Sequence, residues 1–334
     1  MIRYSKQVAQ LTAIAAAVLA APAFAATAVD ANAEFDTGFQ NHSNGVIQGG
    51  RIETNISGKG TNGDFFVAGR GTLILGASGS AGADDAWVQF GNSAVDVKLV
   101  RFEAADLWPT PGDVFRMSSL YTLNTLRGRA TYAGPAGTND RFHAAITANI
   151  APGTSLEVGI VEKKDVSNGP AVGLAPAGSG GAKGIRPSVA FAAGPVSARL
   201  GFESGKVADG IAPSTATASF TGFGGWVSAG VAPDVTVRAN FSSGKVKFAA
   251  GDLKTSAILL GVDVMGANIS LETGKNKQGG VDTKNTDIFA AYAIPLFGVK
   301  GATFQPALGY QKLKVGSAAT VNNTKVGFRV HYDF

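Results

Sequence analysis

The chain ends with the stretch Lys325-Val326-Gly327-Phe328-Arg329-Val330-His331-Tyr332-Asp333-Phe334. Every second residue from Val326 to the aromatic terminus Phe334 is apolar, and the residues between are glycine or polar. Successive side chains of an extended strand point to opposite faces, so this pattern predicts one apolar and one polar face. One face suits hydrocarbon and the other suits water, which is typical of a strand that crosses a membrane within a closed β-barrel.

The same alternation recurs along the chain. Between Phe142 and Ile150 the apolar positions alternate with His143, Ala145, Thr147 and Asn149. Tight turns separate such stretches and select antiparallel neighbours; they lie at Ala151-Pro152-Gly153, Gly194-Pro195 and Ala232-Pro233-Asp234. A β-sandwich would also contain many short strands. We favour a barrel because one face of nearly every strand carries a charge or hydroxyl and the other carries plain apolar residues.

The lengths of the connections agree with a barrel. Longer polar, glycine-rich segments are expected to be loops, at 164–184, 205–217, 244–253, 275–284 and 315–323. Outer-membrane barrels combine short periplasmic turns with longer external loops.

The strand count follows from these segments. Eleven or twelve strands are expected between about residue 127 and the C-terminus, with five more near 30–39, 46–57, 64–76, 84–91 and 94–103. Both termini are expected on the periplasmic side, so the number is even. The sequence predicts an all-β, transmembrane antiparallel barrel of 16 strands, with 14 and 18 left open.

The first 25 residues have the features of a secretory signal peptide. Arg3 and Lys6 precede an apolar run at 11–19, and Ala23-Phe24-Ala25 places small residues where a signal peptidase cuts. The run is too short for a transmembrane helix. We therefore expect a signal peptide at 1–25 and a barrel domain at 26–334, exported to the bacterial outer membrane.

Composition excludes several classes of function. Without residues 1–25 the formal net charge falls from +5 to +3, and no block of like charge is present to bind nucleic acid. There is no cysteine, so thiolate metal sites and disulfides are excluded. His42, His143 and His331 are scattered, and His143 with Thr147 lacks a third catalytic member. We expect no metal, no cofactor and no enzyme activity.

One segment breaks the strand pattern. Val97-Lys98-Leu99-Val100-Arg101 leads into Phe102-Glu103-Ala104-Ala105-Asp106-Leu107-Trp108-Pro109, which is too irregular to face lipid. Here the chain resembles the general trimeric porins of Gram-negative bacteria, and the continuation after Arg101 is more similar to the carbohydrate-type members. In that family a Gly-x-Val-x-Leu-Gly-Arg-like strand precedes a third loop that folds inward and narrows the channel. This chain has Val100 where the family usually has glycine.

The resemblance implies a constriction in which acids on the inward loop face arginines on the barrel wall. The candidate acids are Glu103, Asp106 and Asp113, and the candidate bases are Arg51, Arg70, Arg101, Arg116, Arg127 and Arg129. Arg51 is the best candidate for a side chain that points into the lumen, because Arg51, Glu53 and Asn55 alternate with Ile52, Thr54 and Ile56. Opposed charges across a narrow opening orient polar solutes and set ion preference. Trp108 could offer an aromatic face to a sugar ring, although ordinary loop packing is the more common role of such a residue.

Two classes of function remain. The first is a porin for passive diffusion of small hydrophilic solutes and ions, with oligosaccharides as candidate solutes, in contact with outer-membrane lipid and lipopolysaccharide. The resemblance implies that this porin is a homotrimer. The second is a barrel without a channel, acting as an adhesin, a structural anchor or an outer-membrane enzyme.

Overall fold

The computed structural model describes residues 26–41, 45–110, 112, 114–118, 141–163, 182–208, 217–248 and 251–334. These residues form seventeen strands, of which one is only two residues long. The strands are β1 (Ala26–Gln40), β2 (Gly45–Asn62), β3 (Phe65–Gly76), β4 (Ala81–Gly91), β5 (Val95–Arg101), β6 (Arg141–Ala151), β7 (Thr154–Lys163), β8 (Ala182–Ala193), β9 (Val196–Ala208), β10 (Thr217–Ala232), β11 (Val235–Phe248), β12 (Gly251–Val264), β13 (Ala267–Gln278), β14 (Val281–Tyr292), β15 (Ile294–Pro295), β16 (Ala302–Val315) and β17 (Val321–Asp333). The two-residue β15 lies in the connection between β14 and β16, which pair directly.

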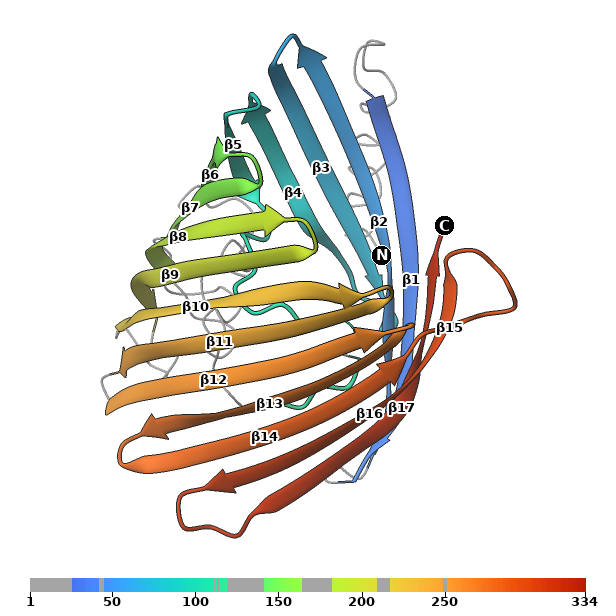
Figure 1. Ribbon diagram of the computed structural model, residues 1–334, viewed down its shortest axis with the longest axis vertical. Coiled ribbons are helices and arrows are strands. Elements are labelled where there is room, and N and C mark those ends of the chain that lie inside the picture. The colour runs from blue at the N-terminus through green and yellow to red at the C-terminus, as the bar shows by residue number, and fades with distance from the viewer. Residues whose placement is uncertain are drawn as a thin grey trace, which may run out of the picture.

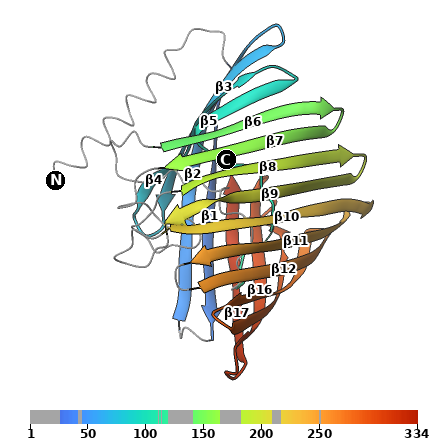
Figure 2. The ribbon, with the colours of Figure 1, turned by 90° about the vertical axis from the view of Figure 1, so that its left-hand side faces the viewer.

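All the strand pairs are antiparallel, and the sheet closes on itself. β1 pairs with β2 on one side and with β17 on the other, so the first and last strands complete a ring. Figures 1 and 2 show the neighbouring strands following one another around this curled sheet. The sixteen long strands confirm the predicted barrel and its strand number.

The closing strand has the predicted register. Phe328 pairs with Thr37 of β1 and with Pro306 of β16, and the next residue, Arg329, pairs with Asp36 and Gln305. Because the side-chain period of a strand is two, this register turns Phe328 and Arg329 to opposite faces of the wall. The alternation at the end of the sequence therefore sets the register that closes the barrel.

The tight turns lie where the sequence predicts them. β6 and β7 are joined by Pro152-Gly153, β8 and β9 by Gly194-Pro195, and β10 and β11 by Pro233-Asp234. Gly153 and Gly194 have φ of 71° and 55°, which suits residues without a Cβ. These turns and both ends of the barrel chain lie at one rim, called here the turn rim; the opposite rim is called the loop rim.

Two predicted loops are wrong. Segment 244–253 is mostly strand, because β11 continues to Phe248 and β12 begins at Gly251. Segment 275–284 is likewise strand except for Gly279 and Gly280 between β13 and β14. Lysines and other polar residues suggested loops there, but a barrel strand keeps its ladder beyond the hydrocarbon, where its outward side chains become polar. The expected loops at 164–184 and 205–217 fall largely outside the described residues. The loop at 315–323 is shorter than expected, because β16 ends at Val315 and β17 begins at Val321.

Burial follows the alternation. On β13 the outward Ile269 and Leu271 are 48% and 40% exposed, whereas the inward Ser270 and Glu272 are 1% and 0% exposed. The outward face therefore carries exposed apolar residues and the interior carries the polar ones. No helix in the described part of the chain is long and apolar enough to span a membrane.

Val100 is held in an unusual backbone conformation. Its φ is 88°, a region that β-branched residues rarely adopt, and the position is the one where the resembling family has glycine. We expect Val100→Gly to raise the free energy of unfolding by about 1 kcal/mol, since relief of strain exceeds the entropic cost of glycine. Urea unfolding of the refolded protein measures this, and Val97→Gly on the same strand should instead destabilise.

Candidate functional site

A segment of chain leaves the wall after β5 and runs along the inside of the barrel. It comprises residues 102–118 without 111 and 113, and it is called here the inward segment. Phe102 is 1% exposed and stacks on His143 of β6, with ring centroids 3.9 Å apart. The Ala105 amide donates a hydrogen bond to the Glu157 carboxylate of β7 at 3.0 Å. The root of the segment is thus fixed to the first strands that it passes.

Residues of β9, β10 and β11 contact the middle of the inward segment. Leu107 fits against Gly201 of β9, where a Cβ would come within 2.6 Å of the leucine. The indole N–H of Trp226 donates to the Asp106 carbonyl at 2.9 Å, and the Asn240 amide donates to the Pro109 carbonyl at 2.7 Å. These contacts keep the segment against the wall rather than across the opening.

The distal end is held by β13 to β17. Arg116 and Ser118 both bond to the carboxylate of Glu272, which is fully buried. The Met117 amide donates to Asp287 at 2.9 Å. Phe115 lies over the paired Gly38 and Gly327 of β1 and β17, and a Cβ at Gly327 would approach its ring to 2.5 Å. Glycine at these positions therefore makes room for the segment.

The inner wall of β2, β3 and β17 carries a ladder of paired charges. Arg51 of β2 lies 3.5 Å from Glu34 and 3.2 Å from Glu53. Arg70 of β3 lies 3.8 Å from Glu53 and 3.7 Å from Asp85.

Arg329 of β17 continues this ladder. It lies 2.7 Å from Asp36 of β1 and 3.4 Å from Glu34. The Arg51 and Arg70 side chains are 43% and 34% exposed, so their charges face the open interior.

The candidate residues are arranged differently from the expected opposition of loop acids and wall arginines. Arg51 and Arg70 lie on the wall, but their nearest carboxylates are on the wall as well. Arg116 does not lie on the wall; it belongs to the inward segment and binds a wall carboxylate. Arg101 ends β5, and its guanidinium donates to the Asp84 carbonyl at 2.5 Å.

The acidic candidates are partly enclosed. Glu103 is half-buried. Asp106 is also half-buried, and its carboxylate accepts the Trp108 amide at 2.8 Å. Asp113, Arg127 and Arg129 lie outside the described residues.

The Trp108 side chain is buried and does not face the lumen. It is 4% exposed and lies against Ala257 and Leu259 of β12. A sugar-stacking platform needs an exposed ring face, and this indole offers none. Sequence reasoning also missed Glu272, Asp287 and Trp226, because inward polar residues that anchor a segment have the same strand phase as those that line open water.

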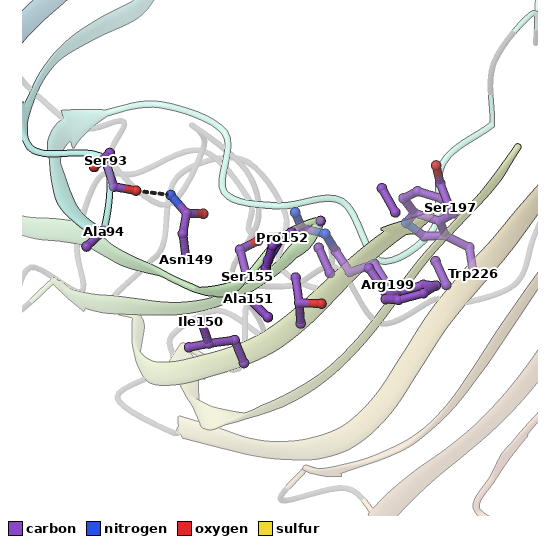
Figure 3. A pocket seen from close by; sticks show the side chains of 16 residues that line it. Ser93, Ala94, Asn149, Ile150, Ala151, Pro152, Ser155, Ser197, Arg199 and Trp226 are labelled. Carbon is purple, nitrogen blue, oxygen red and sulfur yellow. Dashed lines mark hydrogen bonds between the residues drawn. The ribbon is translucent and has the colours of Figure 1, made fainter. Parts of the chain in front are cut away.

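A recess lies below the inward segment at the turn rim (Figure 3). It has a volume of about 750 Å³, and Asn149, Arg199 and Trp226 contribute to its lining. The Asn149 amide donates to the Ser93 carbonyl at 2.7 Å. The same Trp226 that holds Asp106 thus also borders the recess. No group of three or more His, Asp or Glu side chains suited to a metal occurs in the described part of the chain.

Comparison with known proteins agrees with this architecture. No family model and no curated protein matches the sequence. Among solved structures, an anion-selective porin from Comamonas acidovorans has a TM-score of 0.65 at 18% identity, over 93% of this chain and 100% of that one. The chain has the fold of the outer-membrane porins.

Two further structures share the fold. The trimer form of OmpT, an outer membrane protein of Vibrio cholerae, has a TM-score of 0.62 at 12% identity, covering 93% of this chain and 99% of that chain. A mutant of the Rh. blastica porin has a TM-score of 0.58 at 13% identity, covering 92% and 100%. At these identities the likeness concerns the fold alone.

Proposed function

We propose that the chain is an outer-membrane porin, a water-filled channel for passive diffusion of small hydrophilic solutes and ions. The observation that carries this proposal is the inward segment, which runs along the inside of the barrel, together with the wall arginines Arg51, Arg70 and Arg329, whose side chains are partly exposed. A narrowed polar passage selects by size and local charge, whereas a barrel that only anchors needs no such passage.

The proposal includes export, location and assembly. Residues 1–25 serve as the signal peptide and 26–334 form the barrel in the bacterial outer membrane, beside its lipids and lipopolysaccharide. Three copies assemble through the face of β1 to β3, whose outward positions carry no charged residue among those described. The trimer form of the V. cholerae structure supports this assembly.

Single-channel recording in planar bilayers tests the proposal. The refolded protein should insert with conductance steps in groups of three, and maltodextrin added to the bath should block current only if the channel prefers carbohydrates. Absence of any conductance from folded protein would overturn the porin and leave an adhesive, structural or enzymatic barrel.

The charged wall should control ion preference. We expect the double variant Arg51→Gln, Arg70→Gln to shift the reversal potential in a salt gradient toward cations. A unit charge about 6 Å from a passing ion in a water-like dielectric contributes about 0.7 kcal/mol, so the anion-to-cation permeability ratio should fall about threefold or more. The double variant Lys254→Gln, Lys284→Gln removes the same charge from the outward face and should leave the reversal potential unchanged.

A further inference from the structure

Ten lysines lie on the outward face of the barrel near the loop rim, and together they are called here the lysine belt. They are Lys183, Lys206, Lys245, Lys247, Lys254, Lys275, Lys277, Lys284, Lys312 and Lys314. Each belongs to a strand between β8 and β16 and lies within four residues of its loop-rim end. Each also has the strand phase of exposed apolar residues lower on the same face, such as Phe202, Ile258 and Leu271. The belt therefore borders the apolar band.

The strand register places many of these lysines directly opposite one another. Lys183 pairs with Lys206, and Lys254 pairs with both Lys245 and Lys277. Lys284 likewise pairs with both Lys275 and Lys314. Like charges directly opposite one another on neighbouring strands destabilise a sheet. A negatively charged ligand bound to the belt would offset this repulsion.

The chain itself supplies little of that partner. At the described outward positions of β7 to β17 there are three acids, Glu162, Asp252 and Asp282. They pair with Lys183 at 3.3 Å, Lys245 at 2.5 Å, and Lys275 at 3.3 Å. Six of the ten lysines have no carboxylate within ion-pair distance in the described part of the chain: Lys206, Lys247, Lys254, Lys284, Lys312 and Lys314.

One part of the belt is hollowed. A recess of about 460 Å³ lies across β9, β10 and β11, lined by Lys206, Lys245 and Lys247 together with the hydroxyls of Ser204, Ser219 and Thr221. Three ammonium groups and three hydroxyls supply the donors that a phosphate group accepts. The long apolar stem of a lysine side chain can lie along the border of the hydrocarbon region while its ammonium group reaches the lipid headgroups.

We propose that the lysine belt binds a lipid whose headgroup carries two or more phosphates, with one phosphate in the recess of Lys206, Lys245 and Lys247. The inference rests on the proposed function, because it requires the barrel to cross the outer membrane with the loop rim in the outer leaflet. Neighbouring strands are about 4.8 Å apart, so lysines on adjacent strands can contact separate phosphates of one headgroup. β1 to β5 carry no outward lysine in their described residues, so the belt marks the arc that faces lipid rather than another copy.

The test compares lipids that differ in phosphate number. The refolded full-length protein in uncharged detergent is titrated with purified diphosphoryl lipid A, monophosphoryl lipid A and phosphatidylglycerol, and bound lipid is counted by native mass spectrometry. We expect the double variant Lys206→Gln, Lys247→Gln to bind diphosphoryl lipid A at least about tenfold more weakly than the parent, since each lysine near a charged lipid surface contributes about 1 kcal/mol. The matched control Lys59→Gln, Lys300→Gln changes the same charge away from the belt and should bind as the parent does.

The outcomes separate the two proposals. Equal binding of all three lipids, or unchanged binding by the belt variant, would overturn the lipid site. Should Lys206→Gln, Lys247→Gln fail to fold, Lys254→Gln, Lys284→Gln tests the neighbouring part of the belt. Planar-bilayer conductance is recorded in parallel: conducting protein that binds no diphosphoryl lipid A refutes only the belt, and non-conducting protein that binds it refutes only the porin.

Discussion

Replacing Glu272 with glutamine is expected to release the distal end of the inward segment from the barrel wall. The Glu272 carboxylate is fully buried, accepts hydrogen bonds from Arg116 and Ser118, and is the ionic anchor of that end. Removing one partner of a buried ion pair leaves the other uncompensated, at a cost of about 3–5 kcal/mol. Because Arg116 can swing into the lumen, the loss falls mainly on the position of the segment.

Single-channel recording measures this effect. The Glu272→Gln channel should show larger fluctuations of its open current and a changed conductance, while the folded barrel still resists heating in detergent. The matched control is Glu162→Gln, which removes an exposed carboxylate paired with Lys183 and should cost less than about 1 kcal/mol. A quiet channel of parental conductance in Glu272→Gln would show that Glu272 does not hold the segment.

The sequence predicts the barrel better than it predicts the site. Alternation at 142–150 and 326–334 predicts strands, because only an extended strand places every second residue on the same face. The same alternation says nothing about which inward residue touches the inward segment. Glu272 and Asp287 look like ordinary lumen residues until the segment is placed beside them.

The inward segment shows why the predicted opposition of charges differs from the structure. The resemblance correctly implies that chain after Arg101 turns into the lumen. The positions of its side chains, however, are determined by contacts with many strands. Trp108 packs against β12, and Arg116 forms an ion pair with Glu272 of β13. These contacts join residues more than a hundred positions apart, which local pattern cannot reveal. The alternation of residues also does not predict the positive φ of Val100. The only sign of it in the sequence is that the resembling family usually has glycine at this position.

A second large effect is expected at the buried pair Arg186–Glu203. Arg186 of β8 and Glu203 of β9 are 1% and 0% exposed, and their Nε and Oε1 atoms are 2.9 Å apart. We expect Glu203→Gln to destabilise the folded barrel by about 3–5 kcal/mol, because it leaves the Arg186 charge buried with only partial compensation. Glu157 and Asp106 also interact electrostatically with Arg186, so the loss should fall toward the lower end.

The double variant Arg186→Met, Glu203→Leu separates charge from packing. A buried ion pair can be replaced by apolar residues of similar volume at little cost, so the double variant should be more stable than Glu203→Gln alone. Urea unfolding of the refolded barrel, followed by tryptophan fluorescence, gives the three free energies. A double variant no more stable than Glu203→Gln would contradict this and show that the loss does not come from the uncompensated charge. Recovery in the double variant would instead assign the cost to the uncompensated charge of Arg186, whose electrostatic neighbour Glu157 also accepts the Ala105 amide at the root of the inward segment.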